Sequence, residues 1–157
     1  MKKILTIFIC GALFVWSCSA PVESNEETSQ PEEMSSEPAI NQETTQAVLD
    51  HHLSAFGAND LDAIMEDYAD EATLITPDST FHGKGQIRGF FEGLFASFPT
   101  EGTAFAMDKA VVDNEVAYIL WHATTPTIEV PLGTDTFVIL DGKIKFQTFA
   151  GVINPVD

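Results

Sequence analysis

The second half of the chain is a series of β-type segments joined by very short turns. Four such segments are expected, at residues 103–112, 116–125, 128–140 and 143–153. Asp113-Asn114 separates the first pair, and Asp141-Gly142, a typical two-residue hairpin loop, separates the last pair. Turns this short join antiparallel neighbours. The sequence therefore predicts a four-stranded antiparallel meander, bent near Pro131-Leu132-Gly133.

Three helical segments are predicted before these strands. Apolar residues at helical spacing indicate a helix from Glu43 to Gly57, and Asp60 can cap a second helix that continues through Tyr68. The third helix has the clearest apolar face, formed by Ile87, Phe90, Phe91, Leu94, Phe95 and Phe98. Because Gly89 and Gly93 weaken this helix, we expect another backbone to approach it there. A short strand at 72–76 precedes the third helix. The predicted class is α+β, with the helices on one face of a curved sheet.

The N-terminal region has the pattern of an export signal. A short positive head precedes the apolar run of residues 4–16, which is too short to span a bilayer. The run ends at Val15-Trp16-Ser17-Cys18, which resembles the cleavage motif of bacterial lipoproteins. We therefore expect residues 1–17 to be a lipoprotein signal peptide. Cys18 would then carry the lipid that anchors the protein in a bacterial envelope membrane, at the outer membrane or cell surface. An ordinary secretory signal, cut near Ser19-Ala20, is the alternative.

A polar segment follows the signal. Residues 18–42 are rich in Ser, Glu, Pro, Gln and Asn and have few large apolar side chains. Such a segment cannot bury enough surface to offset its ordering entropy, so it is interpreted as a disordered acidic tether. The remaining residues, 43–157, form one predicted domain.

Charge and cysteine placement exclude several kinds of function. The chain has 24 acidic and 7 basic residues, which argues against nucleic-acid binding. The two cysteines, Cys10 and Cys18, both lie in the N-terminal region, so the domain has no thiol chemistry of its own. His51 and His52 are adjacent on a helix and cannot both bind one metal ion. We therefore expect neither a metal nor a cofactor.

Four short stretches together resemble the nuclear transport factor 2-like superfamily, in its SnoaL-like group. They are NDLDAI at 59–64, YADEAT at 68–73, HGKGQI at 82–87 and ILDGKI at 139–144. The resemblance covers residues 43–153 and implies a cone, in which three helices close a pocket formed by a curved, mostly antiparallel sheet. Because the family includes isomerases, cyclases, dehydratases, hydrolases and non-enzymes, the fold does not fix the function.

One branch of that family, the ketosteroid isomerases, provides a test of chemistry. Its members use a tyrosine on the first helix, an aspartate base after the first strand and a protonated aspartate on a late strand. The matching positions here are His52, Thr76 and Thr136. A threonine hydroxyl is no unassisted proton acceptor near neutral pH. We therefore expect no ketosteroid isomerase activity, and whether the protein is another kind of enzyme stays open.

The resemblance also assigns strand faces and a pocket. The residues expected to face inward are Ala117, Ile119, Trp121, Ala123, Thr125, Leu132, Thr134, Thr136, Val138, Gln147 and Phe149. The candidate site is formed by His52, Tyr68, Thr76, Phe91, Trp121, Thr136 and Gln147. Aromatic walls with a few polar groups are typical of small-molecule sites.

His52 and Tyr68 are the candidate catalytic residues, because histidine titrates near physiological pH. The alternative for both is a structural role in the core. Phe137, Ile139 and Phe146 are expected on the outer, convex face of the sheet, which predicts a homodimer through that face.

The leading hypothesis is a membrane-anchored domain that binds a small, largely apolar molecule in its cone. The alternatives are a lyase, isomerase or hydrolase that uses His52 and Tyr68, and a non-enzymatic dimeric interaction module.

Overall fold

The computed structural model describes residues 40–156. The predicted signal peptide, the lipidated Cys18 and most of the acidic tether lie outside the described residues. Across 40–156, no helix has the length and apolar character needed to cross a membrane.

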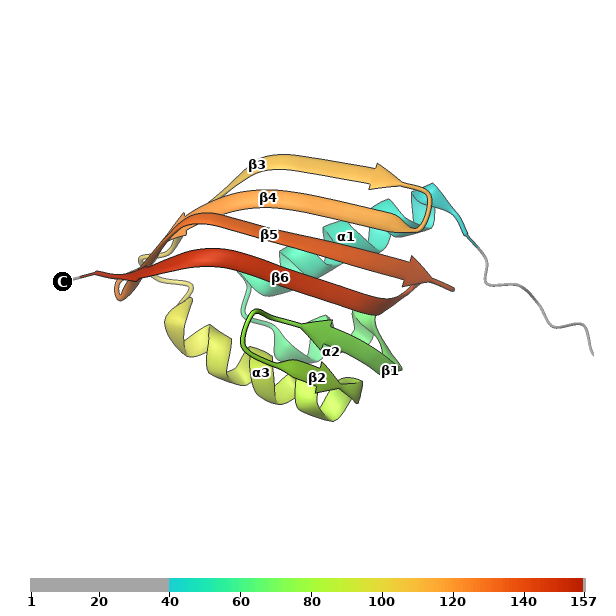
Figure 1. Cartoon of the computed structure of the whole chain (residues 1–157), viewed down its shortest axis with the longest axis horizontal. Helices are drawn as coiled ribbons and strands as arrows, with labels where there is room; N and C mark the ends of the chain where they lie inside the picture. The colour runs from blue at the N-terminus through green and yellow to red at the C-terminus, as the bar shows by residue number, and fades with distance from the viewer. Residues whose placement is uncertain (1–39, 157) are drawn as a thin grey trace, which may run out of the picture. The chain divides into compact units, whose positions relative to one another are not determined.

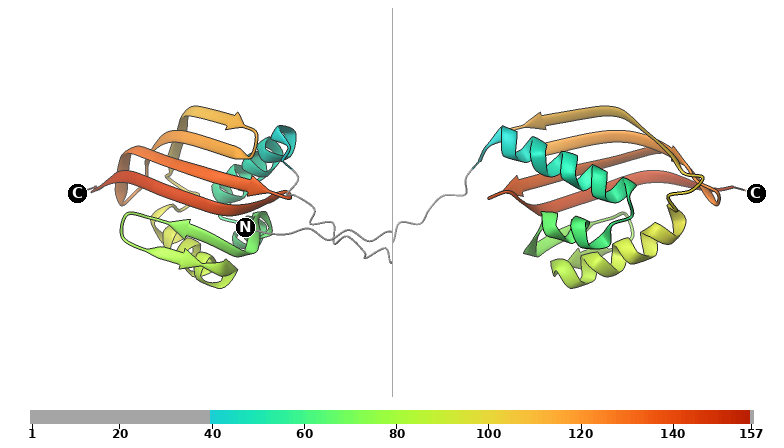
Figure 2. Two further views of the ribbon diagram at one scale, coloured as in Figure 1. Left: turned by 45° about the vertical axis from the view of Figure 1, so that its right-hand side comes forward. Right: turned by 180° about the vertical axis from the view of Figure 1, so that it is seen from behind.

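The described residues fold into helices packed against one sheet (Figure 1). The elements are α1 (Gln42–Gly57), α2 (Leu61–Asp67), β1 (Tyr68–Ile75), β2 (Thr80–His82), α3 (Gly83–Ser97), β3 (Ala104–Asp113), β4 (Val116–Thr124), β5 (Ile128–Leu140) and β6 (Lys143–Pro155). The strand order is β2-β1-β6-β5-β4-β3, and only β1 and β6 pair in parallel. The views in Figure 2 show all three helices on the same side of the curved sheet. The predicted α+β class and the meander of β3 to β6 are confirmed.

The first two helices begin at side-chain caps. The Asn41 carboxamide oxygen accepts the backbone N–H groups of Glu43 and Thr44, and the Asp60 carboxylate accepts that of Ala63. The chain turns between the helices at Asn59, which has a positive φ of 52°. The buried face of α1 includes Leu49 and His52.

The second helix is shorter than its apolar spacing predicts. It ends at Asp67, and Tyr68 already belongs to β1, whereas the sequence predicted helix through Tyr68 and a strand only from residue 72. Tyr68 pairs with Ile144 of β6, and the register shifts before Thr73 pairs with Phe146. Pairing with a strand that comes much later in the chain overrides the local helical spacing.

Gly89 and Gly93 of α3 have no packing role in the described fold. A Cβ added at Gly89 or Gly93 would have no neighbouring atom within 4 Å. The expected close approach of another backbone is therefore wrong. The helix packs through the opposite face, where Ile87 and Phe91 are buried.

The strand faces agree with the prediction in β4 and differ in β5. The residues of β4 that were expected to face inward are buried, and so is Thr125 just beyond the strand. They are Ala117, Ile119, Trp121 and Ala123. In β5 the inward residues are instead Val130, Gly133, Asp135, Phe137 and Ile139. The pairing of β5 with β6 shifts register between Glu129 and Leu132, and this irregularity reverses the faces of all later residues.

Two predictions change as a result. Thr136 faces away from the interior, beside half-buried Thr134 and Val138, and Asp135 takes its expected place. Phe137 and Ile139 belong to the core, so the convex face keeps only Phe146 of its three predicted apolar residues, at 52 % exposure.

Candidate functional site

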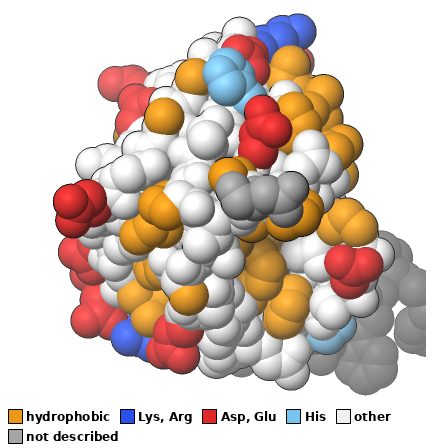
Figure 3. Space-filling model, turned by 90° about the vertical axis from the view of Figure 1, so that its left-hand side faces the viewer, with side chains coloured by type: hydrophobic (Ala, Val, Ile, Leu, Met, Phe, Trp, Pro, Cys, Tyr) orange, Lys and Arg blue, Asp and Glu red, His pale blue; other side chains and the backbone are white. Residues whose placement is uncertain are grey.

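A cavity of about 390 Å³ lies between α1, α3 and the inner face of the sheet. Its walls are mainly aromatic, and they include Phe56, Phe90, Phe91, Phe98, Phe105 and Phe149. The cavity opens to solvent where its lining residues are themselves exposed, at Asp78, Phe105 and Ile153. Figure 3 views the end of the molecule near the C-terminus of β6, where hydrophobic side chains gather around a recess and acidic side chains lie around them.

The polar end of the cavity is organised around Asp135 of β5. This carboxyl is 7 % exposed, and each of its oxygens accepts a hydrogen bond from a neighbouring strand. The indole Nε1 of Trp121 donates to Oδ2 at 2.8 Å, and Nε2 of Gln147 donates to Oδ1 at 2.9 Å. Burial raises the pKa of Asp135, while these two hydrogen bonds and the nearby His52 act in the opposite direction.

Tyr68 supports this arrangement from behind. Its phenol donates to the amide oxygen of Gln147, which directs the amide nitrogen of Gln147 toward Asp135. Burial, followed by the charges of Asp135 and Asp67, raises the pKa of Tyr68 well above 10.0. The phenol therefore keeps its proton and acts as a donor throughout the ordinary pH range.

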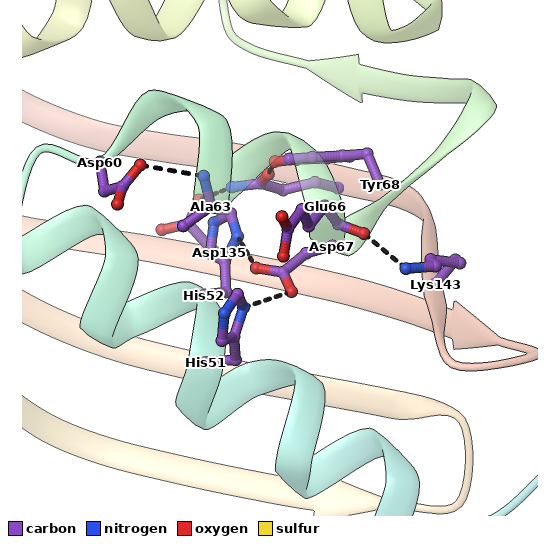
Figure 4. A network of polar contacts seen from close by, with 10 residues as sticks. His51, His52, Asp60, Ala63, Glu66, Asp67, Tyr68, Asp135 and Lys143 are labelled. Carbon is purple, nitrogen blue, oxygen red and sulfur yellow. Dashed lines mark hydrogen bonds and ion pairs between the residues drawn. The ribbon is translucent and has the colours of Figure 1, made fainter.

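The second polar feature is a carboxylate shared by two adjacent histidines (Figure 4). Oδ1 of Asp67 lies 2.7 Å from Nδ1 of His51, which is half exposed. Oδ2 of Asp67 lies 3.3 Å from Nδ1 of His52, which is buried. This second contact is short, but its geometry is not that of a hydrogen bond, so Nδ1 of His52 and Oδ2 of Asp67 have no hydrogen-bond partner in the described residues. Because Nδ1 of His52 faces Asp67 and His52 lines the cavity, Nε2 is the ring nitrogen available to a ligand.

The structure brings most of the predicted site residues together. His52, Thr76, Phe91, Trp121 and Gln147 line the cavity, and Tyr68 contacts it through Gln147. Thr136 is not part of the lining. The functional assignment of these residues stays a prediction, because geometry alone does not test it.

Sequence reasoning missed Asp135, and helical spacing did not direct Asp67 toward His52. Asp135 was missed because the sequence predicted a bend near Pro131-Leu132-Gly133 but not the change of strand face that accompanies it. Asp67 lies at the end of α2, where a predicted longer helix would have directed it elsewhere.

The comparison with ketosteroid isomerases needs one correction. The late strand does place a carboxyl in the cavity, at Asp135, whereas Thr136 faces away from the interior. The position of the base is still occupied by Thr76, whose hydroxyl donates to the carbonyl oxygen of Ser79 at 3.2 Å and accepts its N–H at 3.1 Å. Within residues 40–156 there is no group of three or more histidine, cysteine, aspartate or glutamate side chains placed to hold a metal ion.

The curved sheet, with helices packed on one face around a cavity, places this chain among the small α+β proteins that enclose a pocket. The family model of the SnoaL-like domain matches residues 49–147, and the chain belongs to this family. No functionally curated protein matches the chain.

Solved structures support the same fold. A SnoaL-like protein of unknown function from Burkholderia thailandensis is 20 % identical, with a TM-score of 0.59 over 74 % of this chain and 99 % of that one. A proposed polyketide cyclase from Sinorhizobium meliloti is 19 % identical, with a TM-score of 0.57 over 69 % and 98 %. A proposed ketosteroid isomerase from Kribbella flavida is 13 % identical, with a TM-score of 0.59 over 70 % and 78 %. At these identities the likeness shows the fold alone.

Proposed function

We propose that the domain binds a small, largely apolar molecule whose one polar group reaches Asp135. The observation that carries this proposal is an aromatic cavity of about 390 Å³ in which His52, Asp135 and Gln147 lie close together. Cavities of roughly 300–1,000 Å³ with apolar walls and a few placed polar groups are typical of small-molecule sites. The opening between Asp78, Phe105 and Ile153 gives such a molecule access from solvent.

Isothermal titration calorimetry of the purified full chain with 2-naphthalenemethanol tests this proposal. The probe has an aromatic body and a single hydroxyl. Saturable binding is expected in the wild type and a loss of binding in Leu94→Trp, which fills the cavity from α3. Ala96→Trp places the same side chain on the exposed face of the same helix and should leave binding unchanged. Equal affinity in the wild type and Leu94→Trp would show that the probe binds elsewhere.

Acid–base catalysis is the second candidate function, and the contact between Asp67 and His52 favours it. A carboxylate beside one imidazole nitrogen orients the ring and stabilises its cationic form, so the other nitrogen can accept a proton. His52 has this arrangement, with Asp67 behind it and the cavity in front. Asp135 lies near His52 and lines the same cavity. A reaction that removes a proton from a bound carbonyl compound would use these groups.

Hydrogen exchange provides a direct test of this second candidate. The α-protons of 2-tetralone in D₂O are followed by NMR with the wild-type chain and with His52→Gln. Faster exchange that depends on His52 supports acid–base catalysis. Equal exchange rates with both proteins would exclude His52 as a proton acceptor for this ketone, without affecting the binding proposal.

The membrane anchor is also proposed, on the basis of the sequence at Val15-Trp16-Ser17-Cys18. The wild type is expected in the membrane fraction of a bacterial host, and Cys18→Ser is expected in the soluble fraction. Recovery of both proteins in the same fraction would contradict lipidation at Cys18. A homodimer through the convex sheet face stays a proposal, and Phe146 and Leu132, at 52 % and 47 % exposure, are apolar residues that such an interface would cover.

A further inference from the structure

The cavity lining contains acidic side chains without basic lysine or arginine partners. Two carboxyls, Asp78 and Asp135, belong to the lining, and it contains no lysine or arginine. Of the five basic residues in the described domain, four make contacts elsewhere, as in Lys84 with Asp70 and Lys145 with Glu71. The whole chain has a formal net charge of -17. A ligand in this cavity therefore enters a field of negative charge.

The hydrogen-bonding groups at the polar end are mostly acceptors. The N–H groups of Trp121 and Gln147 that point to Asp135 are already used, and the Tyr68 hydroxyl is used by Gln147. The Asp135 oxygens keep unused lone pairs toward the cavity. One N–H of the Gln147 amide has no assigned partner, so the balance of free groups still favours a donating ligand.

His52 adds a further acceptor. Its Nδ1 lies 3.3 Å from the Asp67 carboxylate, and the negative charge there favours the ring proton on Nδ1. Nε2 then presents a lone pair to the cavity. Asp67 is itself shared with His51, so the negative charge behind His52 is divided between two imidazoles.

Aromatic rings surround this end of the cavity. The rings of His52 and Phe137 are 5.3 Å apart, and those of Trp121 and Phe149 are stacked at 6.1 Å. The faces of aromatic rings attract cations, and this attraction strengthens where water is excluded.

We propose that the ligand is a cation, a protonated amine on an apolar body, and that its N–H groups bind between Asp135 and His52. This inference rests on the proposed function and narrows it to one class of ligand. A carbonyl or carboxylate ligand would place its own acceptor oxygens against the acceptors of Asp135 and His52. A protonated amine supplies the donors and the positive charge that the lining lacks.

The experiment compares three naphthalene probes of matched size by calorimetry with the full-length wild type. They are 2-naphthylmethylamine, a cation, 2-naphthalenemethanol, which is neutral, and 2-naphthoate, an anion. The amine is expected to bind about 10-fold more tightly than the alcohol, and the anion least tightly. If the alcohol binds as tightly as the amine, the cation inference is wrong and the proposed function stands. If none of the three binds, the proposed function fails as well.

A matched pair of variants identifies the carboxyl that is responsible. Asp135→Asn should remove most of the preference for the amine over the alcohol. Asp108→Asn makes the same charge change on the exposed outer face, where Asp108 pairs with His122, and should keep the preference. An unchanged preference in folded Asp135→Asn overturns the assignment to Asp135. The comparison of probes in the wild type does not depend on how well the variant folds.

Discussion

Gly133 of β5 lies directly across from Trp121 of β4, and the indole occupies the space that a side chain at Gly133 would need. A Cβ at Gly133 would stand 2.4 Å from Cε2 of Trp121. Real side chains do not approach so closely, so any other residue displaces the indole. Because the same indole donates to Asp135, Gly133 indirectly positions the polar end of the cavity.

Gly133→Ala is therefore expected to destabilise the fold by about 1–3 kcal/mol, because the added methyl forces Trp121 out of its packed position. Chemical denaturation measures the loss, and the emission of Trp121 should move to longer wavelength as its ring becomes wetter. Gly93→Ala is the control, because its Cβ meets no atom within 4 Å. That change should stabilise α3 by about 0.5–1 kcal/mol. Equal effects of the two substitutions would contradict the close contact with Trp121.

Tyr68→Phe should weaken the fold by about 1–3 kcal/mol, because it leaves the buried amide oxygen of Gln147 without its donor. The Gln147 amide also loses the contact that directs its nitrogen toward Asp135. Urea unfolding gives the change in free energy. The other tyrosine, Tyr118, is half buried on the outer face of β4, and Tyr118→Phe should change stability by less than about 0.5 kcal/mol. Similar losses in both variants would show that the Tyr68 hydroxyl has no special role.

Much of the fold was predictable because its signals are local. The turns Asp113-Asn114 and Asp141-Gly142 fix the meander, and the cap at Asp60 fixes the start of α2. These turns and the cap depend on neighbouring residues, so one sequence is enough to find them. The inward face of β4, which places Trp121 in the cavity, was instead implied by the resemblance to the family.

The predictions were wrong where contacts between distant parts of the chain determine the local structure. Tyr68 becomes a strand residue because β6 pairs with it, although its spacing in the sequence fits a helix. The irregularity between Glu129 and Leu132 reverses the later faces of β5, and the match to the family pattern therefore selected Thr136 instead of Asp135. The contact of Asp67 with two histidines likewise depends on how α2 packs against α1, which no spacing within either helix reveals.

Asp67→Asn should weaken the preference of His52 for the tautomer that carries its proton on Nδ1. The carboxylate beside Nδ1 favours the proton on that nitrogen, and a carboxamide can offer either an oxygen or an N–H group there. The ¹⁵N chemical shifts of the imidazole report which nitrogen carries the proton. His51→Gln is the matched control, because it removes the other partner of Asp67 and leaves the carboxylate beside His52. If the His52 shifts respond equally to both substitutions, Asp67 does not select the tautomer.

The pH dependence of stability tests the buried state of Asp135. Burial raises its pKa in the folded protein above the ordinary value of 3.8. Below pH 3.8 the group is protonated in both states, so its contribution is fully present there. As pH rises toward the folded pKa, Asp135 ionises in the unfolded chain before it does in the folded protein. The contribution of protonated Asp135 to the free energy of unfolding is then lost. The free energy of unfolding of the wild type, relative to Asp135→Asn, should therefore fall with pH above about 4 and then level off. Urea titrations at a series of pH values measure this difference. A difference that rises with pH would mean that the hydrogen bonds from Trp121 and Gln147 outweigh burial and lower the pKa.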